Sequence, residues 1–255
     1  MKLATWNVNS LKVRLPHLLD WLAADQADVV CLQETKTEDV NFPAAALIAA
    51  GYHVNYVGQK TYNGVAIVSR YALADVAIGI PNWDDAQQRV IAATILGVRV
   101  ICVYVPNGQA IGSEKYTYKL AWLQALHAYV AAQLLIYPRL TVLGDFNIAP
   151  ADEDVYDVEA WGEDILVSPA ERAAFVQLLD LGLVDSYRLF EQAPSSFTWW
   201  DYRMAAFRRN RGARIDHVLL SQTLAQHCVS CVVDVAPRKL ERPSDHAPVI
   251  ATLTL

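Results

Sequence analysis

The chain has 255 residues, of which 54% are hydrophobic, and its 27 acidic residues outweigh 21 basic ones to give a formal net charge of −6. This composition supports a substantial core, and it excludes a protein that coats nucleic acid through bulk positive charge. The four cysteines have neither the spacing of a disulfide framework nor that of a complete zinc site, and they fit a reducing compartment.

Apolar runs and helical periodicity predict strands and helices along the whole chain. The expected strands, in chain order, are residues 2–7, 28–33, 52–57, 63–70, 89–96, 98–105, 140–144, 215–221, 229–235 and 247–254. The expected helices are residues 11–24, 42–50, 113–136 and 169–180. Hairpins outnumber strict β-α-β units, which favours mixed or antiparallel sheets with helices outside them.

Neither a linker nor a charge block divides the chain, so we expect a single domain over residues 1–255. The longest uncharged stretches contain several polar residues and are poor candidates for membrane spans, and no signal peptide precedes the first strand. We therefore expect a cytoplasmic monomer without a membrane partner, and in a prokaryote one associated with the nucleoid.

Polar side chains stand at the ends of five apolar runs. These are Asn7 with Asn9, Glu34, Asp145 with Asn147, Asp216, and Asp245 with His246. A single polar residue at a strand end often only caps the strand. Five such ends together offer carboxylates, amides and one histidine but no thiol, and this set suits a hard cation such as Mg²⁺ with a base beside it. The pattern predicts a magnesium-dependent hydrolytic site at one edge of the sheets.

The same strings resemble those of the exonuclease III-type AP endonucleases, in the endonuclease/exonuclease/phosphatase superfamily. They are WNVNSL at 6–11, LQETK at 32–36, YVPNG at 104–108, GDFNI at 144–148, RID at 214–216 and SDHAP at 244–248. The resemblance covers nearly the whole chain and implies a four-layer α/β sandwich. In that fold two sheets pack face to face, helices flank them, and the site lies at one end.

The resemblance also implies roles for individual residues. The metal site would take Mg²⁺, with Mn²⁺ as a substitute, and its residues would be Asn7, Glu34, Asp145, Asn147, Asp245 and His246. The catalytic residues would be Tyr104, Asp145, Asn147, Asp216 and His246. Asn9, Lys36 and Asn107 would contact the substrate. Whether Asp145 or His246 is the general base, and whether one or two metals bind, stays open.

Residues 197–214 combine five arginines and five aromatic residues in an otherwise acidic chain. Arginines contact phosphates and aromatic rings stack on sugars or bases, so we expect this segment to face DNA through Trp199, Arg203, Arg208, Arg209 and Arg211. The alternative is a solvated arginine loop over core aromatics. Ala213 stands where relatives often carry a larger apolar residue, and Ser10 where they often carry glycine.

The expected function is a magnesium-dependent DNA repair nuclease that cuts the phosphodiester 5′ to an abasic site in duplex DNA. The resemblance further implies 3′-phosphodiesterase, 3′-phosphatase and 3′-5′ exonuclease activity. Three alternatives stay open: a 3′-end-trimming exonuclease with little abasic-site activity, a superfamily phosphatase or RNA nuclease, and a DNA-binding scaffold without catalysis.

Overall fold

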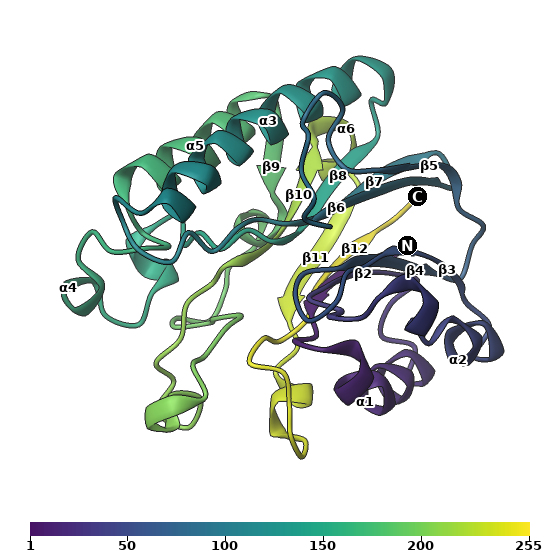
Figure 1. Ribbon diagram of the computed structural model, residues 1–255, viewed down its shortest axis with the longest axis horizontal. Helices are drawn as coiled ribbons and strands as arrows, with labels where there is room; N and C mark the ends of the chain where they lie inside the picture. The colour runs from purple at the N-terminus through teal and green to yellow at the C-terminus, as the bar shows by residue number, and fades with distance from the viewer.

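The computed structural model describes all 255 residues and contains two six-stranded sheets (Figure 1). The first sheet has, in spatial order, the strands β11 (Cys228–Val233), β12 (Val249–Leu253), β1 (Lys2–Asn7), β2 (Val29–Gln33), β4 (Val65–Ser69) and β3 (His53–Val57). The second has β5 (Ala74–Ile78), β6 (Val90–Ile95), β7 (Val98–Tyr104), β8 (Leu140–Asp145), β10 (Asp216–Ser221) and β9 (Leu183–Asp185). Only β1 with β2 and β7 with β8 pair in parallel, so both sheets are mixed.

The sheets pack face to face and helices cover their outer faces (Figure 1). The largest apolar cluster lies between the sheets and draws Val29 and Ile67 from one and Val100 and Val218 from the other. The helices α1 (Leu11–Ala23) and α2 (Ala44–Ala49) cover the first sheet, and α3 (Glu114–Ile136) and α5 (Pro169–Asp180) cover the second. The expected four-layer α/β sandwich is confirmed.

Local sequence explains several of the element boundaries. The β6–β7 hairpin turns at Leu96 and Gly97, which both have positive φ, as a tight two-residue turn between twisted strands requires. Helix α5 begins at a capping box in which Ser168 and Glu171 satisfy each other's backbone amides. The predicted helix 42–50 is shorter than expected, because Pro43 precedes its first turn and residues 39–41 form a separate 3₁₀ turn.

Two short edge strands were not predicted from the sequence. Strand β5 is almost entirely exposed and β9 has only three residues, so neither carries the apolar alternation that marks a half-buried strand. Two small helices, α4 (Val158–Trp161) and α6 (Gln222–Ala225), complete the structure. None of the helices combines the length and the apolarity needed to cross a lipid bilayer.

Candidate active site

Strand register brings the predicted polar residues to one edge of the two sheets. In the first sheet Asn7 pairs with Gln33 in parallel, so Asn7 and Glu34 leave their strands side by side. In the second sheet Asp145 is the register partner of both Tyr104 and Asp216. The site is therefore built from strand ends of both sheets, as the sequence pattern predicted.

Asn7 connects the carboxylates of the two sheets. Its Nδ2 atom donates to Oε1 of Glu34 and to Oδ2 of Asp145, both at 2.9 Å. Tyr104 donates its hydroxyl to the same Glu34 oxygen at 2.8 Å, and Lys36 pairs with the other at 2.7 Å. Burial alone would raise the pKa of Glu34, but Lys36 and Asn7 outweigh it and hold that pKa below its ordinary value. Glu34 is thus kept ionised.

The backbone around these side chains is strained. Asn9, Glu34 and Asn147 have φ values of 42°, 52° and 49°, in the left-handed region that non-glycine residues seldom occupy. Such residues persist where the surrounding structure holds them, and they concentrate at functional sites. Ser10, with φ of 86°, occupies a conformation that favours glycine.

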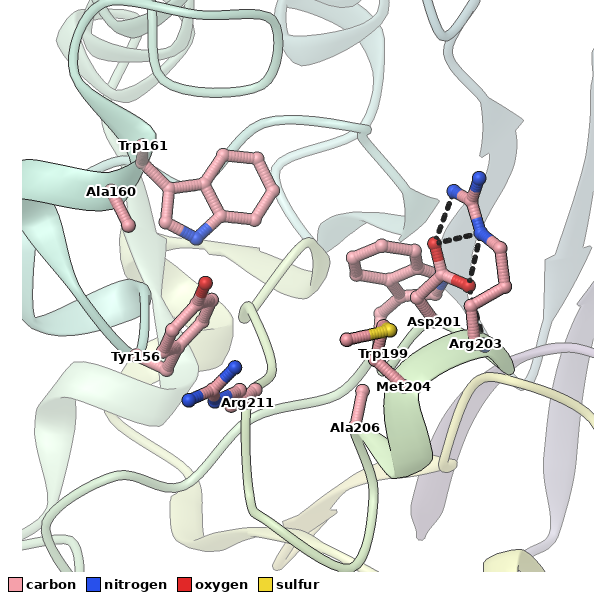
Figure 2. A pocket seen from close by; sticks show the side chains of 9 residues that line it. All are labelled: Tyr156, Ala160, Trp161, Trp199, Asp201, Arg203, Met204, Ala206 and Arg211. Carbon is pink, nitrogen blue, oxygen red and sulfur yellow. Dashed lines mark hydrogen bonds and ion pairs between the residues drawn. The ribbon is translucent and has the colours of Figure 1, made fainter.

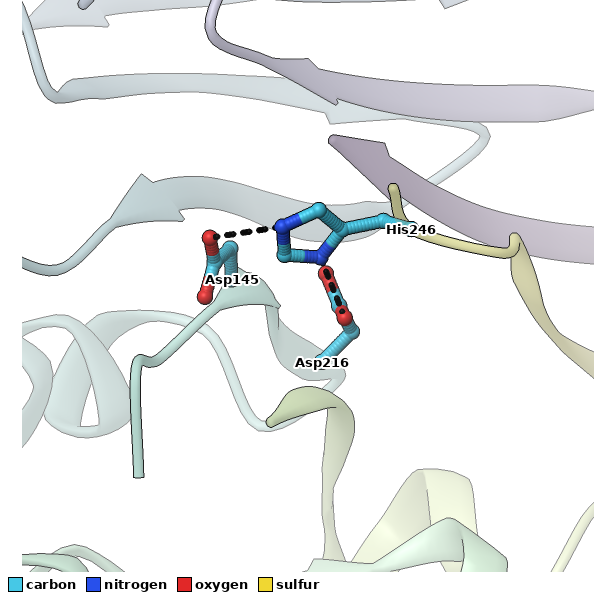
Figure 3. A group of neighbouring side chains, drawn as sticks. All are labelled: Asp145, Asp216 and His246. Atoms are coloured by element: carbon cyan, nitrogen blue, oxygen red, sulfur yellow. Dashed lines mark hydrogen bonds and ion pairs between the residues drawn. The ribbon is translucent and has the colours of Figure 1, made fainter. Parts of the chain in front are cut away.

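His246 lies between two buried carboxylates (Figure 3). Its Nδ1 atom is 2.9 Å from Oδ2 of Asp216, and its Nε2 atom is 3.8 Å from Oδ2 of Asp145. Burial acts to lower the pKa of the imidazole, but the charges of Asp216 and Asp145 prevail and raise it to about 10. The imidazole therefore carries a proton at neutral pH, and its Nε2–H points toward Asp145.

Asp145 is the most perturbed carboxylate of the site. Burial raises its pKa to about 7, against the opposing charge of His246 and with the support of Asp216. Its Oδ1 accepts the backbone N–H of Asn147 at 2.9 Å. The Asn147 side chain donates to the Val105 carbonyl at 3.0 Å and accepts from Asn107 at 3.0 Å. A carboxylate with a pKa near neutrality can exchange a proton at physiological pH.

The oxygen donors of the site fit a divalent cation. Glu34 and Asp145 lie on either side of the Asn7 amide, and one oxygen of Asp216 is buried without any hydrogen-bond partner. Atoms of Asp145, Asp216 and His246 approach within 4.8 Å of one another. A protonated His246 donates rather than ligates, so the carboxylates and the amide are the better candidates to hold Mg²⁺.

Asp245 connects this cluster to the segment that was expected to face DNA. Its Oδ1 accepts from Asn9 at 2.9 Å and its Oδ2 accepts from the indole N–H of Trp199 at 3.1 Å. Trp199 also forms a β-bridge with His246. An open pocket of about 660 Å³ begins at Trp199 (Figure 2) and is lined by Tyr156, Ala160, Trp161, Trp199, Asp201, Arg203, Met204, Ala206 and Arg211.

Sequence reasoning missed Tyr156 and Trp161 in this pocket. Both come from the segment around α4, which carried no predicted element and no chemical motif. The only available signal was a pair of aromatic residues in an acidic loop. Such a pair indicates little until the loop is placed in space.

The segment of residues 197–214, which combines arginines with aromatic residues, divides into buried and exposed parts. Arg208, Arg209 and Arg211 are exposed, and Arg203 is exposed and pairs with Asp201 at 2.6 Å. Arg214 ends the segment that was expected to face DNA, but it does not belong to the exposed part. It is 1% exposed, because it pairs with two buried aspartates, Asp154 at 2.6 Å and Asp185 at 2.8 Å. Two of the five aromatics, Phe197 and Trp200, are likewise core residues.

A buried ion pair supports the loops of the site from behind. Lys119 on α3 contacts the Glu171 carboxylate on α5, and both side chains are fully buried. The Lys119 ammonium also donates to the backbone carbonyls of Asn107 at 3.1 Å and Asn147 at 2.6 Å. This contact fixes both loops to the helical layer, and no sequence motif predicts it.

Comparison with known proteins agrees with this geometry. A profile of the Endonuclease/Exonuclease/phosphatase family matches residues 4–246. The chain belongs to this family. It is 38% identical to exodeoxyribonuclease III of Haemophilus influenzae over 265 residues, which covers 98% of this chain and 99% of that protein.

Solved structures of the family superpose closely on the chain. Two structures of NExo from Neisseria are 52% identical, with a TM-score of 0.98 and full coverage of both chains. One is described as a 3′ phosphatase bound to a product DNA hairpin, and the other as a 3′-5′ exonuclease. An AP endonuclease from Archaeoglobus fulgidus is 38% identical, with a TM-score of 0.96 and full coverage. The chain is therefore a nuclease of the DNA-repair type, in a family of divalent-metal-dependent enzymes.

Proposed function

We propose that this nuclease uses Mg²⁺ to hydrolyse the phosphodiester on the 5′ side of a 3′-terminal or abasic nucleotide in duplex DNA. Water would attack the phosphorus, the P–O3′ bond would break, and the DNA would retain a 3′-hydroxyl. The observation that carries the proposal is the buried Asp145 carboxylate, with a pKa of about 7, placed opposite the protonated His246.

Asp145 and His246 differ in their pKa values, and this difference suggests their roles. Asp145, with a pKa near neutrality, is suited to take the proton of the attacking water. His246 is held protonated by Asp216 and is suited to donate a hydrogen bond to the phosphate as negative charge develops. Of the two candidate bases, these pKa values favour Asp145.

The remaining side chains would position the phosphate. Burial, reinforced by the charge of Glu34, raises the pKa of Tyr104 well above its ordinary value, so its hydroxyl stays a donor. Asn107 and Asn147 would supply neutral amide donors beside it. A magnesium ion held by Glu34, with Asn7 and Asp145 beside it, would neutralise charge on the phosphate when bound.

The relatives favour processing of 3′ ends as the principal activity. The 52% identical NExo is described as a 3′ phosphatase and a 3′-5′ exonuclease. Incision at abasic sites is the second candidate, because the 38% identical protein from Archaeoglobus fulgidus is described as an AP endonuclease. Both reactions would use the same cluster, and they would differ in what occupies the pocket beside Trp199.

A comparison of kcat/KM on three duplexes tests the proposal. The duplexes carry a recessed 3′-phosphate, a recessed 3′-hydroxyl and an internal tetrahydrofuran abasic analogue, each assayed with Mg²⁺, with Mn²⁺ and with EDTA. We expect metal-dependent release of phosphate or mononucleotide, with slower incision at the analogue. Asp145→Asn, purified in parallel, controls for contaminating nuclease. Turnover of an inositol phosphate or single-stranded RNA above that of all three duplexes would contradict the proposal.

A further inference from the structure

The pocket beside Trp199 has two aromatic walls that come from distant parts of the chain. Tyr156 and Trp161 form one wall from the segment around α4, and Trp199 and Met204 form the other (Figure 2). Figure 2 shows the two walls facing each other across an open space, with Arg211 below the Tyr156 ring. We call this feature the aromatic pocket. Its walls lie about 40 residues apart in the chain, so neither motif nor periodicity indicates it.

Backbone pairing fixes the aromatic pocket relative to the catalytic histidine. Isolated β-bridges join Val155 to Ala213, Ala213 to Trp199, and Trp199 to His246. The Ala213 N–H donates to the Trp199 carbonyl at 3.0 Å, and the Trp199 N–H donates back at 2.9 Å. Trp199 on one wall, and Tyr156 next to Val155 on the other, therefore stand on one continuous ladder of backbone bridges that ends at His246. The pocket is preformed, and a ligand would not have to order it.

The lining of the aromatic pocket suits a flat, weakly polar group next to a phosphate. Indole and phenol rings stack on nucleobases without regard to sequence. The Arg211 guanidinium lies 5.8 Å from the centre of the Tyr156 ring and supplies positive charge at the rim. The volume of about 660 Å³ lies within the range of pockets that hold small organic ligands. A deoxyribose alone would leave most of that space unfilled.

We propose that the aromatic pocket binds the nucleobase of the nucleotide on the 3′ side of the scissile phosphate. The proposal rests on the proposed function and narrows its substrate: a 3′-terminal nucleotide that still carries its base is held between the walls. During hydrolysis a water oxygen bonds to phosphorus, the P–O3′ bond breaks and O3′ gains a proton. The nucleotide then leaves as a 5′-monophosphate with its base in the aromatic pocket.

The position of Trp199 supports this assignment. Its indole N–H donates to Asp245, the residue that precedes His246 in the chain. A phosphate next to His246 would therefore have the sugar and base attached to it within reach of the Trp199 ring. The opposite wall, Tyr156 and Trp161, would complete a sandwich around that base. We accordingly name Trp161 and Tyr156 as specificity-determining residues.

The test compares two recessed duplexes whose 3′-terminal nucleotides are released by breaking the same bond. One ends in an ordinary nucleotide and the other in a tetrahydrofuran nucleotide that lacks a base. For Trp161→Ala and Tyr156→Ala, the ratio of kcat/KM for the base-bearing terminus to that for the base-free terminus should fall about tenfold, as loss of one stacking partner predicts. Trp161→Phe and Tyr156→Phe should restore the ratio to within about threefold, because the ring is retained.

Tyr71→Ala is the matched control, because Tyr71 is 36% exposed, close to the 39% of Tyr156, and lies outside the pocket and the catalytic cluster. It should leave the ratio unchanged. Unchanged kcat/KM on both termini in both alanine variants at the pocket, or an equal loss of kcat/KM on both termini, would overturn the proposal. The first result would show that the walls do not contact the base, and the second that they serve DNA binding or folding in general.

A binding measurement separates this proposal from the proposed function. Deoxyadenosine 5′-monophosphate should quench the tryptophan fluorescence of the wild type in calcium, and its Kd should rise about tenfold in Trp161→Ala, as loss of stacking predicts. If the wild type hydrolysed neither terminus, the proposed function would fail and the nucleotide titration would still decide whether the pocket binds a base. Absence of nucleotide binding in an enzyme active on both termini would refute only the pocket.

Discussion

The Nδ1 atom of His246 lies 2.9 Å from Oδ2 of Asp216, while the other oxygen of that carboxylate is buried without a hydrogen-bond partner. The hydrogen bond fixes the orientation of the imidazole and keeps it protonated, and it leaves the second carboxylate oxygen free as a candidate ligand for a divalent cation. That requirement explains why an aspartate begins β10 directly opposite Asp145. A buried carboxylate here would otherwise only destabilise the fold.

Asp216→Asn should reduce the single-turnover rate by roughly 10³-fold, because the imidazole loses both its orientation and the charge that keeps it protonated. DNA affinity in calcium should change by less than about threefold, since the exposed arginines that we expect to contact DNA are untouched. Rapid-quench kinetics on a recessed duplex measure the first quantity, and His53→Asn, at an exposed histidine of β3, is the control. A loss of tenfold or less would place Asp216 outside the reaction.

Glu34→Gln should weaken the apparent affinity for Mg²⁺ by at least tenfold. Removal of a residue that only supports a metal ligand already lowers metal affinity or activity by about 10–100-fold. High magnesium should recover part of the activity. The measurement is activity against magnesium concentration, joined by calorimetric titration of Mn²⁺, which does not depend on turnover. Glu38→Ala, at an exposed carboxylate four residues along, should leave both titrations unchanged. An unaltered magnesium dependence in Glu34→Gln would remove Glu34 from the metal site.

The sequence predicts that these polar residues gather at the strand ends, because strand ends carry their own signal. Asn7, Glu34 and Asp145 each follow a buried apolar run, and strand register then brings them together. The same reasoning fails for Arg214, since its charge suggested DNA although its partners are Asp154 and Asp185, 60 and 29 residues away. Nothing local tells a paired buried arginine from a free one.

The aromatic pocket was beyond prediction for a related reason. Trp161 is the last residue of the short helix α4, and its significance comes from Trp199, which lines the same pocket and is joined through Ala213 to Val155, shortly before that helix. Likewise the edge strand β5 is held by its pairing with β6 rather than by its own apolar pattern. Contacts between loops therefore cannot be predicted from the sequence, whereas contacts that strand register creates can.

His217 should make the fold sensitive to acid. It is fully buried, with Nε2 bound to the Ile148 carbonyl and Nδ1 next to Arg214, and burial lowers its pKa to about 4. Because the folded pKa lies below the ordinary value of about 6.5, the unfolded chain takes up the proton first as the pH falls. Stability is therefore lost as the pH drops from about 6.5 toward 4, by up to about 1.4 kcal/mol per pH unit.

Urea unfolding at pH 7, 6 and 5 tests this prediction. His217→Asn should be less stable than the wild type at pH 7, because a buried ring is lost, but its stability should fall less steeply with acid. Contributions from Asp145 and His246 are common to both proteins and cancel in the difference. Equal slopes in the two proteins would mean that His217 does not titrate on unfolding.

Arg208 and Arg209 should bind DNA phosphates rather than bases, because both are exposed and the structure gives neither an ion-pair partner. Replacement of both by alanine should weaken duplex binding to a similar extent on different sequences. Each lost phosphate contact should reduce the slope of log affinity against log salt concentration by about 0.9. The measurement is a salt titration of binding in calcium, with Arg139→Ala as the control, because Arg139 is exposed at the opposite end of β8 from Asp145. If the double variant kept both the wild-type slope and the wild-type affinity, this loop would face solvent and the DNA would have to cross the enzyme elsewhere.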